Sequence, residues 1–296
     1  MATTIKESFR IYASNLNVSN RQEKIVSNCR KNVVSKISAK LSLHTEQPSR
    51  LIGSYDRDTL TRYLRQGDVD VMIVLHYGKN KSWDNKDGVQ KALRRFRDIL
   101  KEAYPKTDVG IDRNCVTMEL SEFRLDVVPA FRWKEGYYSI PDTYRGAWLP
   151  TDPTRFAEMV TRINKNMGGT FVPLIKMVKG WNRELPKPLR GFHIECMMVD
   201  HYKTYTKPYT YDSTLNVFFS NLPGYLSGAS YDPVNGDRVD LYLDNGGLGY
   251  DRKRLVKQAQ DAANLASEAF SDGESYPSVA IGEWKELFGE FFPAYG

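Results

Sequence analysis

Apolar residues recur along the first 130 positions in two rhythms, one typical of helices and one typical of strands. They return every three or four positions over 20–41 and again over 87–104, which predicts two amphipathic helices. Over 116–120 and 123–130 they alternate one by one, and an unbroken apolar run ends at Leu75, which indicates strands. Strands with intervening helices predict a mixed sheet with helices packed on it.

The pattern changes from Tyr137 onward. Prolines at 141, 150 and 153 indicate a structured crossover, and helical spacing then dominates. We therefore expect an α+β, bilobal fold in which residues 1–150 carry the sheet and residues 151–296 form a helical lobe. The helices expected in the second lobe lie at 154–167, 171–183, 190–200, 212–221 and 251–270, with a last one around Trp284.

Composition sets broad limits on function. The 296 residues are 41% apolar, enough for a sizeable core, and 42 basic against 36 acidic residues give a net charge of +6. That excess favours anionic ligands such as nucleotides but falls short of a protein that coats nucleic acid. The three cysteines are far apart and lack zinc-ligand spacing, and we find no signal peptide or bilayer-spanning run. We therefore expect a cytoplasmic protein with no membrane association.

Carboxylates mark the candidate chemistry. Asp68 and Asp70 begin a predicted strand, so they share one face while Val69 and Val71 point into the core. Two neighbouring carboxylates repel each other unless a cation lies between them, and hard oxygen ligands suit Mg²⁺. An Asp-x-Asp pair alone more often sits at a strand edge and faces water.

Two further features strengthen the metal interpretation. Asp126 lies on a second predicted strand, where it shares a face with Arg124, and Gly53-Ser54 upstream offer backbone N–H groups and a hydroxyl to phosphate. Three acidic groups on two adjacent strands could hold two metal ions for in-line phosphoryl transfer. We therefore expect two Mg²⁺ ions, with Mn²⁺ as a substitute, at Asp68, Asp70 and Asp126.

Gly53-Ser54, then Asp68-x-Asp70, then Asp126 resembles the signature of polymerase-β-like nucleotidyltransferases. Within that superfamily the chain is similar to the bacterial cGAS/DncV-like nucleotidyltransferases (CD-NTases). The resemblance implies an active site in the cleft between the lobes and a long N-terminal helix that braces both. It continues through Pro173–Asn182, Gly191–Glu195, Trp284–Gly289 and Phe292-Pro293.

The resemblance also implies a nucleotide-binding set beyond the carboxylates. Gly53 and Ser54 would grip the β- and γ-phosphates. Lys176 and Lys179 share one helix face, and the lysine at the position of Lys179 contacts triphosphate in the family. Two solvated lysines are the alternative. Relatives carry Ser-Tyr where this chain has Gly191 and Phe192. Phe192 keeps an aromatic face for stacking on a base, unless it lies in the core. A backbone N–H could replace the hydroxyl that is missing at Gly191.

The function implied by the resemblance is synthesis of a cyclic di- or trinucleotide second messenger from NTPs, ATP or GTP or both. It would serve CBASS-type antiphage defence through an effector protein that responds to the cyclic nucleotide, with an RNA or protein activator as an option. Three alternatives stay open. The chain could transfer a nucleotide to RNA or protein, make linear 2′-5′ oligonucleotides, or be a catalytically inactive nucleotide or RNA sensor.

Overall fold

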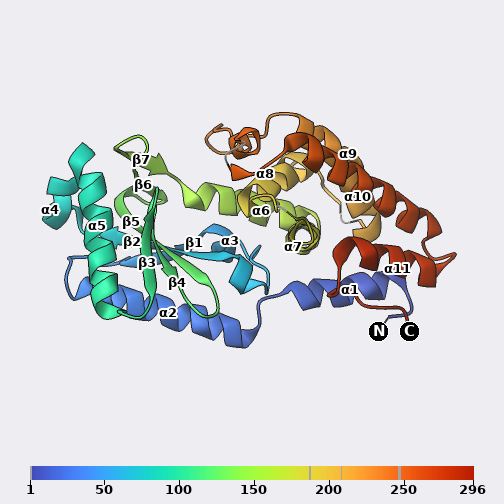
Figure 1. Cartoon of the computed structure of the whole chain (residues 1–296), viewed down its shortest axis with the longest axis horizontal. Helices are drawn as coiled ribbons and strands as arrows, with labels where there is room; N and C mark the ends of the chain where they lie inside the picture. Colours follow the sequence, from blue (N-terminus) through green and yellow to red (C-terminus); the bar gives the residue numbers. More distant parts are fainter. Residues whose placement is uncertain (1, 187, 208, 246–247) are drawn as a thin grey trace. The chain divides into compact units, whose positions relative to one another are not determined.

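The computed structural model describes residues 2–186, 188–207, 209–245 and 248–296. The chain divides into two compact units: Val18–Ala157 are built on a β-sheet, and Met1–Asn17 together with Glu158–Gly296 are built of helices (Figure 1). The first residues of the chain therefore cluster with the C-terminal helices. The domain bounds 1–150 and 151–296 stay a prediction.

Seven strands form one mixed sheet in the sheet unit. Their order is β1-β2-β5-β4-β3, with β6 pairing β5 and β7 pairing β6. β2 and β5 run parallel, and the other paired strands are antiparallel. The strands span Ser49–Ile52 (β1), Asp68–Leu75 (β2), Asp108–Asp112 (β3), Cys115–Glu119 (β4), Arg124–Lys134 (β5), Tyr137–Asp142 (β6) and Ala147–Thr151 (β7).

Two long helices, α2 (Asn20–Ser38) and α5 (Lys86–Ala103), lie beside this sheet (Figure 1). The side chain of Ser19 begins α2 by accepting from the Gln22 N–H, and that of Asn85 begins α5 by accepting from the Gly88 N–H. Their apolar stripes share one core with alternate residues of the strands, as the spacing predicted. Short helical segments connect these elements: α3 (Gly53–Asp56), α4 (Tyr77–Asn80), and 3₁₀ turns at Leu64–Gln66 and Lys81–Trp83.

The segment predicted as a crossover is instead a pair of strands, β6 and β7, so that prediction is wrong. Its prolines argued against strands, because proline lacks the N–H that a central ladder needs. Pro150 lies on β7, an edge strand paired with β6. Pro141 lies beyond Ser139, where the pairing of β6 with β5 ends. Neither proline therefore has strand partners on both sides.

The helical unit packs around aromatic rings from both ends of the chain. α1 (Ile5–Leu16) was not predicted. Its Phe9 ring centre lies 5.2 Å from that of Trp284, and its Tyr12 ring centre lies 4.9 Å from that of Phe288, both on α11 (Pro277–Phe288). The boundary between the units falls within α6 (Pro153–Asn166). The other helices are α7 (Phe171–Arg183), α8 (Gly191–Tyr202), α9 (Tyr211–Ser227) and α10 (Arg252–Asp272), with a 3₁₀ turn at Leu241–Asp244. Across the described residues, no helix combines the length and apolar character needed to span a bilayer.

Candidate active site

Three predicted carboxylates lie on one face of the sheet. The register of the parallel strands β2 and β5 pairs Asp70 with Asp126 and Asp68 with Arg124. Directly paired residues of neighbouring strands point to the same face, and so do residues two apart on one strand. Asp68, Asp70 and Asp126 therefore project together across strands about 4.8 Å apart. Val69 and Val71 are fully buried in the core, as predicted.

Asp126 is held by an arginine from its own strand. Arg124 donates its Nε–H to Oδ1 of Asp126 at 2.8 Å and its Nη2–H to Oδ2 at 3.2 Å. The same Nη2 donates to Oδ2 of Asp112 on β3 at 3.0 Å. Burial alone would lower the pKa of Arg124, but the hydrogen bonds and negative charges of Asp126, Asp112 and Asp68 together raise this pKa above its usual value. The guanidinium therefore stays protonated and places a positive charge among the carboxylates.

Arg124 and Asp112 were not among the predicted site residues. The alternation along 123–130 already puts Arg124 on the face of Asp126, and this spacing is the signal that could have found the pair. Asp112 carries no such signal. It comes near Arg124 only because β3 pairs with β4 and β4 pairs with β5.

The donor chemistry of this face suits a hard divalent cation, because carboxylate oxygens are the ligands that Mg²⁺ prefers. Asp68, Asp70 and Asp126 are the residues that could hold it. As they stand, no three His, Cys, Asp or Glu side chains in the described part of the chain are gathered closely enough to hold a metal. The Arg124 guanidinium already contacts both oxygens of Asp126, so this carboxylate is paired with the arginine side chain.

The turn after β1 closes onto Asp70. Ile52 ends β1 opposite Asp70, and Gly53 follows with a φ of +67°, in the left-handed region. A Cβ at position 53 would overlap Oδ2 of Asp70, so only glycine leaves room for this carboxylate. The carbonyl of Ser54 accepts from the N–H groups of Thr59 (2.9 Å) and Leu60 (3.0 Å), which fixes the turn that carries the Ser54 hydroxyl. The structure thus brings Gly53 to Asp70, with Ser54 as the next residue of the turn.

A second group of predicted residues gathers in the helical unit. Nζ of Lys179 on α7 lies 2.6 Å from Oε1 of Glu195 on α8, and the two side chains are 12% and 1% exposed. Gly191 begins α8 beside this lysine, since a Cβ at 191 would lie 3.6 Å from Cε of Lys179. Phe192 is 37% exposed, so it does not lie in the core. Lys179 therefore lies beside the start of α8, where Gly191 is the first helical residue and Phe192 is partly exposed.

Lys176 does not join this group as predicted. The spacing puts Lys176 and Lys179 on one helix face, but α7 is buried on nearly all sides. Lys176 is only 3% exposed, and its ammonium donates to Oδ1 of Asn17 at 2.9 Å. The alternative of a solvated lysine is therefore wrong for Lys176, because Asn17, which follows the unpredicted helix α1, covers its ammonium.

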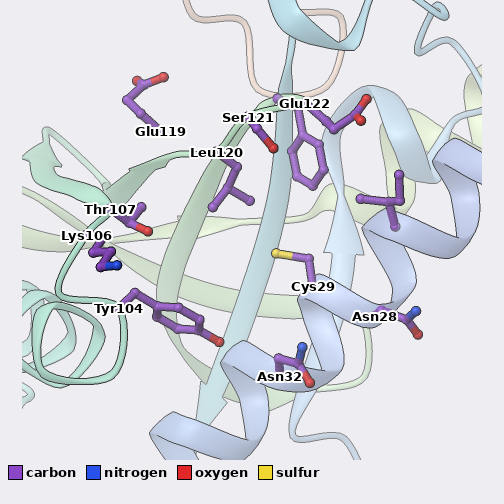
Figure 2. A pocket seen from close by; sticks show the side chains of 12 residues that line it. Asn28, Cys29, Asn32, Tyr104, Lys106, Thr107, Glu119, Leu120, Ser121 and Glu122 are labelled. Carbon is purple, nitrogen blue, oxygen red and sulfur yellow. The ribbon is translucent and has the colours of Figure 1, made fainter.

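A hollow of about 560 Å³ lies in the sheet unit between α2, the end of α5 and the turn that joins β4 to β5. Figure 2 shows Cys29 and Asn32 on one side of it and Tyr104, Lys106 and Ser121 on the others. Burial raises the pKa of the Cys29 thiol to about 11, which keeps it protonated and unreactive. Among the described residues that line the hollow there is no member of the predicted site.

Comparison with known proteins gives a family match and several relatives. The model of the Second Messenger Oligonucleotide or Dinucleotide Synthetase domain matches residues 3–164. The chain is 27% identical over 281 residues to a cyclic AMP-AMP-AMP synthase of an Acinetobacter species, covering 86% of this chain and 74% of the relative. It is 23% identical over 266 residues to the CBASS oligonucleotide cyclase CdnC of Escherichia coli, covering 81% of each.

Solved structures agree with these matches at the level of fold. E. coli CdnC in complex with HORMA-deltaN gives a TM-score of 0.67 at 19% identity, covering 96% of each chain. CdnC solved with ATP gives a TM-score of 0.69 at 19% identity, covering 98% of this chain and 99% of the other. The predicted α+β fold of the polymerase-β-like class is therefore confirmed.

Proposed function

The chain belongs to the Second Messenger Oligonucleotide or Dinucleotide Synthetase family, and from this premise we propose that it joins NTPs into a cyclic di- or trinucleotide. Membership makes it a nucleotidyltransferase and confirms the predicted resemblance to the CD-NTases. One observation carries the proposal: the register of β2 and β5 sets Asp70 opposite Asp126, with Asp68 on the same face. That face has the donors that in-line phosphoryl transfer needs.

Enzymes of this family type use divalent metal, and in this chain Asp68, Asp70 and Asp126 would hold two Mg²⁺ ions, or Mn²⁺ in their place. Bound there, the ions would offset negative charge on the α-phosphate and on the departing pyrophosphate. Asp126 takes up the proton of the attacking ribose hydroxyl. Most of the rate enhancement then comes from positioning and charge stabilisation.

Other residues hold the nucleotide. Gly53 offers its N–H and Ser54 its hydroxyl to the β- and γ-phosphates. Lys179 adds a positive charge for the triphosphate, and the N–H of Gly191 supplies a further donor. Phe192 stacks on a base, an interaction worth about 1–3 kcal/mol. A nucleotide contact of Lys176 stays a prediction, because it would require release of Asn17.

The names of the relatives guide the choice of substrate and partners. ATP is the first substrate to test and GTP the second, since one relative is a cyclic AMP-AMP-AMP synthase and CdnC was solved with ATP. The product would act as a second messenger in CBASS-type antiphage defence, bound by an effector protein that responds to cyclic nucleotides. A HORMA protein is the first activator to test, and RNA the second.

Incubation with the four labelled NTPs and Mg²⁺, followed by phosphatase and chromatography, tests this function. We expect a phosphatase-resistant product that disappears in the Asp68→Asn/Asp70→Asn double variant, and omission of single NTPs would name its bases. A product whose migration changes after phosphatase has a terminal phosphate and would indicate a linear synthase. No product, even with a HORMA protein or RNA added, would overturn the proposal.

A further inference from the structure

Arg124 places a positive charge among the three carboxylates. It pairs with Asp68 in the register of β2 and β5 and precedes Asp126 by two residues, so its side chain shares their face. Its Nε and Nη2 bond to different oxygens of Asp126, at 2.8 and 3.2 Å. This bidentate geometry is the strong form of an arginine–carboxylate pair. Both oxygens of Asp126 are therefore engaged by one cation.

Two cations can bind Asp126: the guanidinium of Arg124 and a divalent metal ion. A bound Mg²⁺ lies only about 2.1 Å from its oxygen ligands. Metal and guanidinium on the same carboxylate would then repel each other, beside a side chain that is 9% exposed, where water screens charges weakly. This repulsion weakens metal binding for as long as the guanidinium contacts Asp126.

Asp112 offers the guanidinium a second partner nearer to solvent. Its Oδ2 accepts from Nη2 of Arg124 at 3.0 Å, and its side chain is 63% exposed. Arg124 is 33% exposed, so its guanidinium has room to turn outward. It can leave Asp126 while it keeps the bond to Asp112.

We propose that Arg124 competes with the divalent cation for Asp126, and that Asp112 retains the guanidinium when the metal binds. Before metal binds, the arginine neutralises a buried carboxylate that would otherwise destabilise the fold. Arg124 then sets the metal concentration at which Asp126 becomes available. The inference rests on the proposed function, because the metal site concerned is the one that nucleotidyl transfer requires.

Binding of Mn²⁺ alone, without nucleotide, tests the proposal through the loss of the free-ion electron paramagnetic resonance signal. Arg124→Gln removes the competing charge and should tighten Mn²⁺ binding at least about ten-fold, since one adjacent charge changes the proton affinity of a carboxylate by that much or more. Asp112→Asn removes the negative charge of the guanidinium's second partner, so it should hold the guanidinium less strongly and weaken Mn²⁺ binding. The exposed position of Asp112 makes this second variant safe for folding, and thermal unfolding is recorded for each protein.

Arg97→Gln is the matched control. Arg97 is 35% exposed and pairs with Asp98 on α5, so the substitution removes an equally exposed positive charge from the same unit. It should leave Mn²⁺ binding unchanged. A shift as large as that of Arg124→Gln would mean that net charge alone explains the effect and would overturn the proposal.

The remaining outcomes separate this proposal from the function on which it rests. If Asp126→Asn abolishes Mn²⁺ binding but Arg124→Gln leaves it unchanged or weakens it, the metal site stands and the competition is refuted. Tighter binding in Asp112→Asn would refute it as well. If Mn²⁺ binding does not depend on Asp126 at all, the metal site of the proposed function fails, and the competition fails with it.

Discussion

Replacing Gly53 with alanine should disable the site without unfolding the protein. Gly53 has a φ of +67°, where a residue with a Cβ costs about 1–2 kcal/mol more than glycine. The new Cβ would also overlap Oδ2 of Asp70 and lie 3.0 Å from its Cγ. The carboxylate of Asp70 would have to turn away from the position that faces Asp126.

The two effects differ in size. The backbone cost lowers the free energy of unfolding by about 1–2 kcal/mol, and each kcal/mol lowers Tm by about 1.6 °C for a chain of 296 residues. Displacing a catalytic group by about 1 Å can lower a rate about 100-fold. We therefore expect Gly53→Ala to melt a few degrees lower but to form product about 100-fold more slowly.

Gly136→Ala separates these effects. Gly136, in the turn between β5 and β6, has a φ of +76°, but a Cβ there would come no closer than 3.7 Å to another atom, Oδ1 of Asp152. This control has the same backbone cost without a clash. Initial rates with labelled NTPs and thermal unfolding are measured for both variants. Rates within a few-fold of each other would refute the reasoning that Gly53 makes room for Asp70.

Two further predictions concern buried ionisable groups of the helical unit. Lys179→Met removes the positive charge that lies 2.6 Å from the buried carboxylate of Glu195 and should lower the free energy of unfolding by about 3–5 kcal/mol. Adding Glu195→Gln should restore most of it in denaturant unfolding, and no recovery would contradict the pairing. Burial lowers the pKa of His193 to about 4, below the unfolded value of about 6.5, so the unfolded chain binds a proton first as the pH falls. The free energy of unfolding should therefore drop by about 2 kcal/mol between about pH 6.5 and 5. His193→Gln should reduce this pH dependence, measured by urea titrations. An unchanged pH dependence would exclude this histidine as its source.

The carboxylate face was readable from the sequence, because strand alternation alone puts Asp68 and Asp70 on one side and Asp126 on the face of Arg124. The register that sets Asp70 opposite Asp126 was not. It depends on a parallel pairing between segments more than 50 residues apart, which local patterns do not specify. For the same reason Asp112 escaped notice, since β3, which carries it, was itself not predicted.

In the helical unit too, single helices were predicted from the sequence but the contacts between helices were not. The spacing of residues 171–183 and 190–200 predicted α7 and α8, but the burial of Lys176 depends on Asn17, which follows the unpredicted α1. The signals for α1 are present in the sequence, because apolar residues recur at helical spacing and follow Thr4, a residue type that often caps helices. In the structure the side chain of Thr4 accepts from the Glu7 N–H. The pairing of Lys179 with Glu195 joins two helices and could not be read from either one alone.

The most direct test of nucleotide cyclisation at Asp68, Asp70 and Asp126 is the count of pyrophosphate released per nucleotide incorporated. Each phosphodiester bond made from an NTP releases one pyrophosphate. A ring has as many such bonds as nucleotides, whereas a linear product has one bond fewer. We predict one pyrophosphate for every nucleotide incorporated by the wild-type protein and none released by Asp126→Asn. Fewer than one per nucleotide, or release that persists in Asp126→Asn, would contradict this account.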